Sequence, residues 1–197
     1  MSHSDAPPKR NEYLAIAARS LTLARVVAVV PFLWLLVDVA HGGSPAARSV
    51  LALLYGFVVL SDFLDGRIAR RAGAASAFWA RADVGADMFF NLSSLAAAAR
   101  LGLIGPWVAA AMALLAGRFV LRISRGSDKK WAELPEDRAG KLAGVLFYVL
   151  VGWITAEVAS GGLLGRFALA RGGDAVFLYT LVVLCSGRAR PMSSRRP

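Results

Sequence analysis

The sequence predicts an all-α protein that crosses a membrane several times, as a polytopic bundle of six transmembrane helices. Hydrophobic residues make up 57% of the 197 residues, and the mean hydropathy of +0.55 is too high for an ordinary soluble domain. Several apolar runs approach the roughly 20 residues that a helix needs to cross a bilayer. Basic residues lie between these runs, as they do in the loops of membrane proteins.

Five of the expected helices are long apolar runs, at residues 21–40, 46–64, 83–99, 101–121 and 139–159. The sixth is the shortest, because the run 175–185 is too short to cross a bilayer alone, so we expect it to extend N-terminally past Asp174. Pro31 would kink the first helix, and Pro106 would lie near the first turn of the fourth. Residues 69–82 and 126–137 are the expected polar connections.

The two ends of the chain are polar and flank a single transmembrane domain, residues 21–187. Residues 1–20 form an N-terminal cytoplasmic segment, in which residues 12–20 are either a short amphipathic helix on the membrane surface or an extension of the first transmembrane helix. Residues 188–197 form a basic cytoplasmic tail.

The basic residues are distributed unevenly between the two sides of the expected bundle. All but four of the 23 Lys and Arg residues fall on one side, and the exceptions are Arg48, Arg100, Arg166 and Arg171. The positive-inside rule makes the first side cytoplasmic, with both termini inside. Because the net charge of +10 is spread between apolar segments, it does not indicate nucleic-acid binding. Cys185, His3 and His41 are too isolated to form a disulfide or a zinc site.

Four aspartates mark residues 61–87 as the stretch around which the chain is organised. Asp62 and Asp65 are one turn apart, and Asp83 and Asp87 lie on one face of the next helix at positions i and i+4. Two pairs of carboxylates on consecutive helices can converge on one point, where they would repel strongly without cations between them. The spacing therefore predicts a site for hard divalent metal ions.

The same residues resemble the signature of the CDP-alcohol phosphatidyltransferase family. The pattern Asp-x2-Asp-Gly-x2-Ala-Arg followed by Asp-x3-Asp is matched by Asp62, Asp65, Gly66, Ala69, Arg70, Asp83 and Asp87. The start of the first helix is similar to the family's Asn-x2-Thr-x2-Arg, with Thr22 and Arg25 matching and Arg19 at the asparagine position. One signature position departs from the pattern, because Trp79 stands where the family has glycine.

The resemblance implies an enzyme that transfers a phosphatidyl group from CDP-diacylglycerol to a small alcohol and releases CMP. Two Mg²⁺ or Mn²⁺ ions would be held by Asp62, Asp65, Asp83 and Asp87, with Asp87 also the candidate general base. Gly66, Ala69 and Arg70 would bind the CDP group. Glycerol 3-phosphate is the default acceptor on the family's base rate, while inositol phosphate or a second phospholipid remains open. The implied location is a bacterial cytoplasmic membrane, with the active site facing the cytoplasm among membrane lipids; whether the chain forms a homodimer is open.

Several roles have alternatives. Arg118, Arg122 and Lys141 would bind an acceptor phosphate or face lipid headgroups. Arg25 would bind a substrate phosphate or extend to the headgroups.

Trp79 would lie at the membrane interface, stack on cytosine, or block the nucleotide pocket and abolish activity. An ion-coupled transporter is the alternative of another class, since intramembrane aspartates also mark ion pathways.

Overall fold

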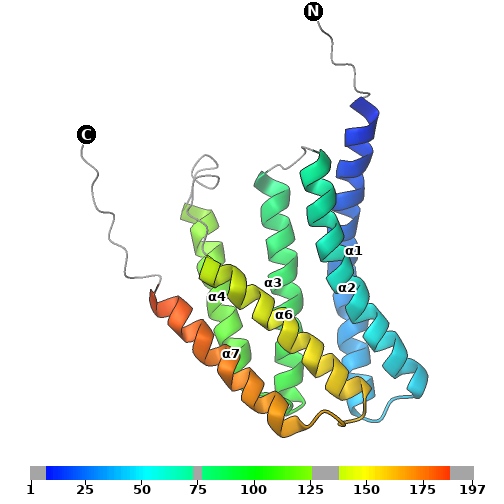
Figure 1. Cartoon of the computed structure of the whole chain (residues 1–197), viewed down its shortest axis with the longest axis vertical. Helices are drawn as coiled ribbons and strands as arrows, with labels where there is room; N and C mark the ends of the chain where they lie inside the picture. Colours follow the sequence, from blue (N-terminus) through cyan, green and yellow to red (C-terminus); the bar gives the residue numbers. More distant parts are fainter. Residues whose placement is uncertain (1–7, 73–76, 126–137, 187–197) are drawn as a thin grey trace, which may run out of the picture.

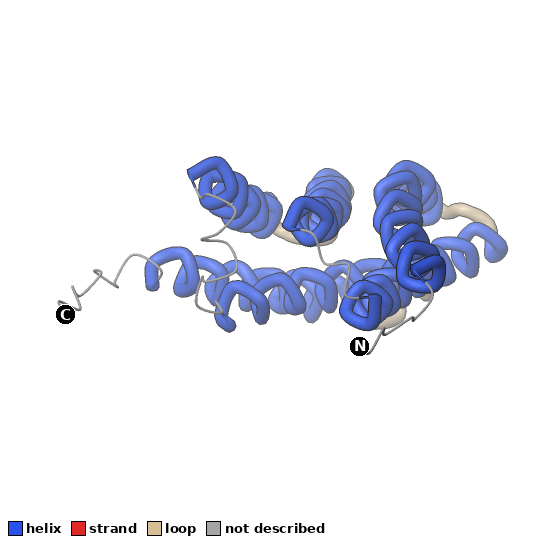
Figure 2. Tube along the Cα trace, turned by 90° about the horizontal axis from the view of Figure 1, so that it is seen from above, coloured by secondary structure: helices blue, strands red, loops and turns tan. Residues whose placement is uncertain are grey.

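The computed structural model describes residues 8–72, 77–125 and 138–186, and the long elements in these ranges are all helices (Figures 1 and 2). They are α1 (Pro8–Ala40), α2 (Pro45–Ala72), α3 (Ala77–Arg100), α4 (Pro106–Arg125), α6 (Arg138–Ala159) and α7 (Arg166–Ser186). Successive helices run in opposite directions, so the start of α1 and the ends of α2, α4 and α7 point toward the same end of the bundle (Figure 1). The predicted all-α helix bundle is confirmed.

Within the described residues, four helices are long and apolar enough to cross a membrane. Their apolar segments are Ser20–Ala40, Pro45–Leu64, Leu142–Ala159 and Arg166–Cys185, and α4 has a shorter apolar part, Pro106–Leu121. The outward faces carry large exposed apolar side chains such as Val27, Trp34, Leu53, Val149 and Val182, which suit contact with lipid rather than water. The chain is therefore a multi-pass membrane protein. The expected N-terminal extension of the sixth helix is confirmed, since α7 begins at Arg166.

The helix boundaries settle one open alternative and differ from the expected ones at two places. Helix α1 is continuous from Pro8 through Pro31, so residues 12–20 extend the first transmembrane helix instead of forming a separate surface helix. The expected connection 69–82 is much shorter, because α2 continues to Ala72 and α3 begins at Ala77. Hydropathy marks where a helix leaves the bilayer, whereas the backbone stays helical beyond that point. The expected connection 126–137 lies outside the described residues.

The second difference is at the start of the fourth helix, which the sequence placed at residue 101. Residues 101–105 instead form the turn between α3 and α4, and Pro106 is the first residue of α4. Gly102 adopts a φ of 68°, and the Leu103 N–H donates to the Ala98 carbonyl at 3.0 Å. This is a helix C-cap that favours glycine, and proline is well suited to the first position of the next helix.

Helices α1, α2, α3 and α6 surround the predicted site. Helices α1 and α6 each pack against α2 and α3, while α4 and α7 pack against each other and flank this group. The α2–α6 contact is close at Gly152, where a Cβ atom would lie 2.7 Å from the Tyr55 hydroxyl. That hydroxyl donates a 2.7 Å hydrogen bond to the Tyr148 carbonyl, which fixes the backbone of α6 beside α2. The aromatic rings of Phe32, Phe90 and Tyr148 pack together between α1, α3 and α6.

Candidate metal centre

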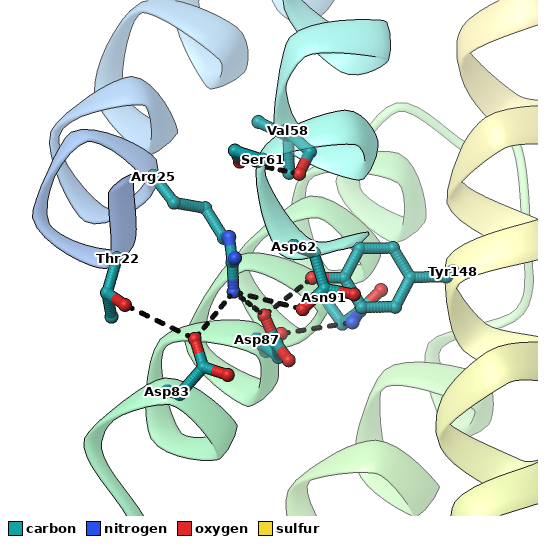
Figure 3. Close-up of polar contacts among 9 residues, drawn as sticks. All are labelled: Thr22, Arg25, Val58, Ser61, Asp62, Asp83, Asp87, Asn91 and Tyr148. Atoms are coloured by element: carbon teal, nitrogen blue, oxygen red, sulfur yellow. Dashed lines mark hydrogen bonds and ion pairs between the residues drawn. The ribbon is translucent and has the colours of Figure 1, made fainter. Parts of the chain in front are cut away.

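Three carboxylates from two helices converge in the interior of the bundle (Figure 3). Asp62 comes from α2, and Asp83 and Asp87 come from successive turns of α3. One oxygen of each carboxylate lies within 4.8 Å of the other two. The i, i+4 spacing places Asp83 and Asp87 on one face of α3, and that face is turned toward α2. The convergence that the spacing predicts is thus seen for these three aspartates.

The Arg25 side chain lies among the three carboxylates. Its exposed fraction is 0%, and Nη1 lies 3.4 Å from Asp62 Oδ1 and 3.2 Å from Asp83 Oδ1. The same nitrogen forms an ion pair with Asp87 Oδ1. One turn earlier in α1, the Thr22 hydroxyl donates to Asp83 Oδ1 at 3.4 Å. Thr22 and Arg25 therefore belong to the site, and the structure excludes the interpretation that Arg25 extends to the headgroups.

Two further residues support Asp87, and sequence analysis missed both. The Tyr148 hydroxyl, from α6, donates to Asp87 Oδ1 at 2.8 Å. The Asn91 side-chain amide donates to the Asp87 main-chain carbonyl at 3.0 Å. Asn91 continues the i, i+4, i+8 polar stripe of α3, a signal that was available in the sequence. Tyr148 lies in an apolar run, where a single tyrosine carries no such signal.

The donor set fits a divalent metal ion. Carboxylate oxygens are the ligands that Mg²⁺ and Mn²⁺ prefer. The side chains of Asp62, Asp83 and Asp87 are 38%, 30% and 22% exposed, so all three carboxylates are partly accessible. Hydrogen bonds from Thr22 and Tyr148 orient two of the three carboxylates, as supporting groups do around metal ligands. The arrangement can therefore hold a hard cation that an incoming substrate can reach.

The other predicted site residues lie farther along α2, α4 and α6. Asp65, Gly66, Ala69 and Arg70 follow Asp62 within α2, and Arg122 and Lys141 lie in α4 and α6, but their side chains fall outside the described part of the structure. Arg118 is half-buried, and its Nη1 donates to the Val183 carbonyl of α7 at 3.3 Å. In the described contacts, Arg118 thus joins α4 to α7 and does not reach the carboxylates.

Trp79 lies in the first turn of α3 and is partly buried. It precedes Asp83 by four residues in a continuous helix, so it shares the face of α3 that carries Asp83 and Asp87. Trp79 is thus one turn from Asp83 along α3. The three roles expected for the indole stay predictions.

Comparison with known proteins agrees with this geometry. A profile of the CDP-alcohol phosphatidyltransferase family matches residues 15–185, from α1 to α7. A curated relative, the cardiolipin synthase (CMP-forming) of Streptomyces coelicolor, is 36% identical over 75 residues. That similarity covers 38% of this chain and 34% of the relative, so it spans about a third of the relative's length.

Proposed function

This chain belongs to the CDP-alcohol phosphatidyltransferase family, and from that premise we propose that it transfers a phosphatidyl group from CDP-diacylglycerol to an alcohol and releases CMP. The observation that carries the proposal is the convergence of Asp62, Asp83 and Asp87 on a partly open site between α2 and α3. In this reaction the acceptor hydroxyl attacks the phosphorus that bears the diacylglycerol group. The bond from that phosphorus to the bridging oxygen of the diphosphate breaks, and CMP leaves.

We assign the carboxylates to two divalent cations, Mg²⁺ or Mn²⁺, held by Asp62, Asp65, Asp83 and Asp87. When bound, such ions neutralise the charge of the diphosphate and of the leaving CMP. Asp87 is the proposed general base, which takes the proton of the acceptor hydroxyl. Arg25 and Tyr148 both contact Oδ1 of Asp87, and we assign proton acceptance to Oδ2. Tyr148 thereby keeps the carboxylate oriented.

The CDP group is proposed to lie along α2 beyond Asp62. Gly66 and Ala69 have little or no side chain, which would let a nucleotide approach the helix. Arg70 would contact the diphosphate or the cytosine. Trp79, on the site face of α3, would lie at the edge of this position.

We consider two acceptor alcohols. Glycerol 3-phosphate is the default that the family resemblance implies, and Arg118, Arg122 and Lys141 are its proposed phosphate ligands. The curated relative is a CMP-forming cardiolipin synthase, which favours a lipid acceptor. Cardiolipin carries two phosphatidyl groups on one glycerol, so making it with release of CMP requires phosphatidylglycerol as the acceptor. We propose phosphatidylglycerol as the first acceptor to test and glycerol 3-phosphate as the second.

The proposed location is a bacterial cytoplasmic membrane. The start of α1, the ends of α2 and α4 and the starts of α3 and α6 share one end of the bundle, and these segments hold 13 of the 23 Lys and Arg residues. Among the described helices, only Arg48, Arg100, Arg166 and Arg171 lie toward the other end. By the positive-inside rule this end, with the carboxylate site and both termini, faces the cytoplasm.

The deciding experiment measures CMP release by the purified protein in lipid nanodiscs. CDP-diacylglycerol is supplied with Mg²⁺ or Mn²⁺ and, in separate reactions, with phosphatidylglycerol, glycerol 3-phosphate or inositol phosphate. We expect metal-dependent CMP release with one acceptor, and mass spectrometry of the lipid product identifies it. No CMP with any acceptor would refute the proposal. Metal uptake into sealed vesicles in that case would favour the ion-coupled transporter.

A further inference from the structure

Arg25 is an unusual neighbour for a metal centre, because it brings a permanent positive charge into the space between the ligands. The guanidinium is fully buried and contacts the carboxylates of Asp62, Asp83 and Asp87 through one nitrogen. An arginine cannot lose its proton in a protein, so this charge is always present. Three carboxylates so close together would repel one another, and the guanidinium offsets that repulsion.

The position of Nη1 overlaps the position that a shared metal ion needs. Mg²⁺, a hard divalent cation, binds carboxylate oxygens at about 2.0–2.1 Å. The three oxygens lie within 4.8 Å of one another, so an ion that contacts all three must lie between them. Nη1 lies 3.2 Å from Asp83 Oδ1 and 3.4 Å from Asp62 Oδ1 and contacts Asp87 Oδ1, so a cation bound to these three oxygens would meet Nη1. Arg25 and a divalent cation therefore exclude each other from the centre of the cluster.

The surroundings of Arg25 limit where its side chain can go. Its neighbours on the outer face of α1, Leu23, Val26 and Val27, are exposed on the apolar surface, so an outward path would take the charge into lipid. The three carboxylates are 22–38% exposed, so a path on their exposed side would keep the guanidinium beside polar oxygens. We take rotation of the long side chain toward that side as the movement that frees the centre.

We propose that Arg25 is the internal counter-cation of this site: it holds the three carboxylates together when no metal is bound, and a divalent cation must displace it in order to bind. This role goes beyond the proposed transfer reaction and does not depend on it. Arg25 therefore weakens metal binding while it stabilises the metal-free protein. A residue that only packs inside the bundle would have the second effect without the first.

The test measures Mn²⁺ binding without any substrate, by electron paramagnetic resonance, on protein in nanodiscs. Arg25→Gln removes the charge and keeps a polar side chain. We expect it to bind Mn²⁺ at least about tenfold more tightly than the wild type and to unfold at a lower temperature without metal. Saturating Mn²⁺ should restore the unfolding temperature. Arg48→Gln is the matched control, since Arg48 is a partly buried arginine near the opposite end of α2, and its Mn²⁺ affinity should equal that of the wild type.

A second measurement uses the wild type, in case Arg25→Gln does not fold without metal. Phenylglyoxal modification of Arg25, followed by peptide mass spectrometry, should be low without metal and should rise when Mn²⁺ saturates the site. Unchanged or weaker Mn²⁺ binding by Arg25→Gln would overturn the proposal. An extent of Arg25 modification that is the same with and without Mn²⁺ would also overturn it. Because neither measurement requires turnover, a protein that releases no CMP can still support the proposal.

Discussion

Tyr148→Phe tests whether the α6 hydroxyl orients the proposed general base. The substitution removes one oxygen, which donates to Asp87 Oδ1 at 2.8 Å. The ring itself remains, together with its stacking on Phe90 at a centroid distance of 6.1 Å. The change is therefore confined to one hydrogen bond within an otherwise preserved core.

The expected loss of kcat/KM in Tyr148→Phe follows from the contacts that Asp87 keeps. A hydrogen bond to a charged group contributes about 1.5–3 kcal/mol. Asp87 keeps its ion pair with Arg25 and is partly exposed, so water can replace some of the lost bond. The lower end of the range, about 1.5 kcal/mol, applies and corresponds to a roughly tenfold loss of kcat/KM. A loss of this size is also what supporting residues of metal sites show, about 10–100-fold.

The assay is CMP release with CDP-diacylglycerol and the preferred acceptor, together with the pH profile of kcat/KM. Tyr179→Phe is the matched control, because it also removes one tyrosine hydroxyl that contacts another helix, but that hydroxyl donates to the Ala139 main-chain carbonyl at 3.3 Å. We expect Tyr179→Phe to lower the unfolding temperature and to change kcat/KM little. Wild-type kcat/KM and an unchanged pH profile in Tyr148→Phe would show that the hydroxyl does not act through Asp87.

Three further predictions concern the cluster, the tryptophan and the orientation. Asp83→Asn should lower CMP release at least about a hundredfold and weaken Mn²⁺ binding, because changes to supporting residues alone cost about 10–100-fold; retained activity with normal helix content by circular dichroism would remove Asp83 from the site. Trp79→Gly should weaken donor binding by about 1–3 kcal/mol if the indole stacks on the cytosine; a lower donor KM would instead mean that it blocks the pocket, and an unchanged KM that it lies at the interface. A tag near Gly43 should be reached only from outside the cell, whereas a reporter fused after Arg190 should be active only in the cytoplasm; the opposite pattern would contradict the orientation.

The sequence was sufficient to predict the helices, because long runs of high hydropathy mark the segments that cross the bilayer. Each long apolar run became a helix, and the short run 175–185 was completed by residues from Arg166 onward. Boundaries near the membrane edge were wrong for the same reason. Helix α2 continues to Ala72, eight residues past the expected end, because hydrogen bonding of the backbone does not stop where the side chains become polar.

Only the part of the site that lies on the consecutive helices α2 and α3 was predictable from the sequence. Asp62, Asp83 and Asp87 lie on consecutive helices, so spacing and helix periodicity were enough to expect their convergence. Arg25 and Tyr148 reach the cluster from α1 and α6, and their place depends on how four helices pack. A single sequence carries little information on such packing, so Arg25 had two interpretations and Tyr148 had none.

The position of the cluster relative to lipid explains how one site can handle a substrate that is both polar and apolar. Asp62 lies two residues before the end of the apolar segment Pro45–Leu64, and its neighbours Leu60 and Phe63 are exposed on the outer surface. A CDP-linked lipid has acyl chains that are costly to remove from the bilayer, by about 0.8 kcal/mol per CH₂ group. A cluster at this depth lets the chains stay in lipid beside α2 while the diphosphate reaches the carboxylates from the polar side. The same argument applies to a phosphatidylglycerol acceptor, whose glycerol hydroxyl is tethered at the depth of the headgroups. Glycerol 3-phosphate has no such tether and would need a pocket of its own.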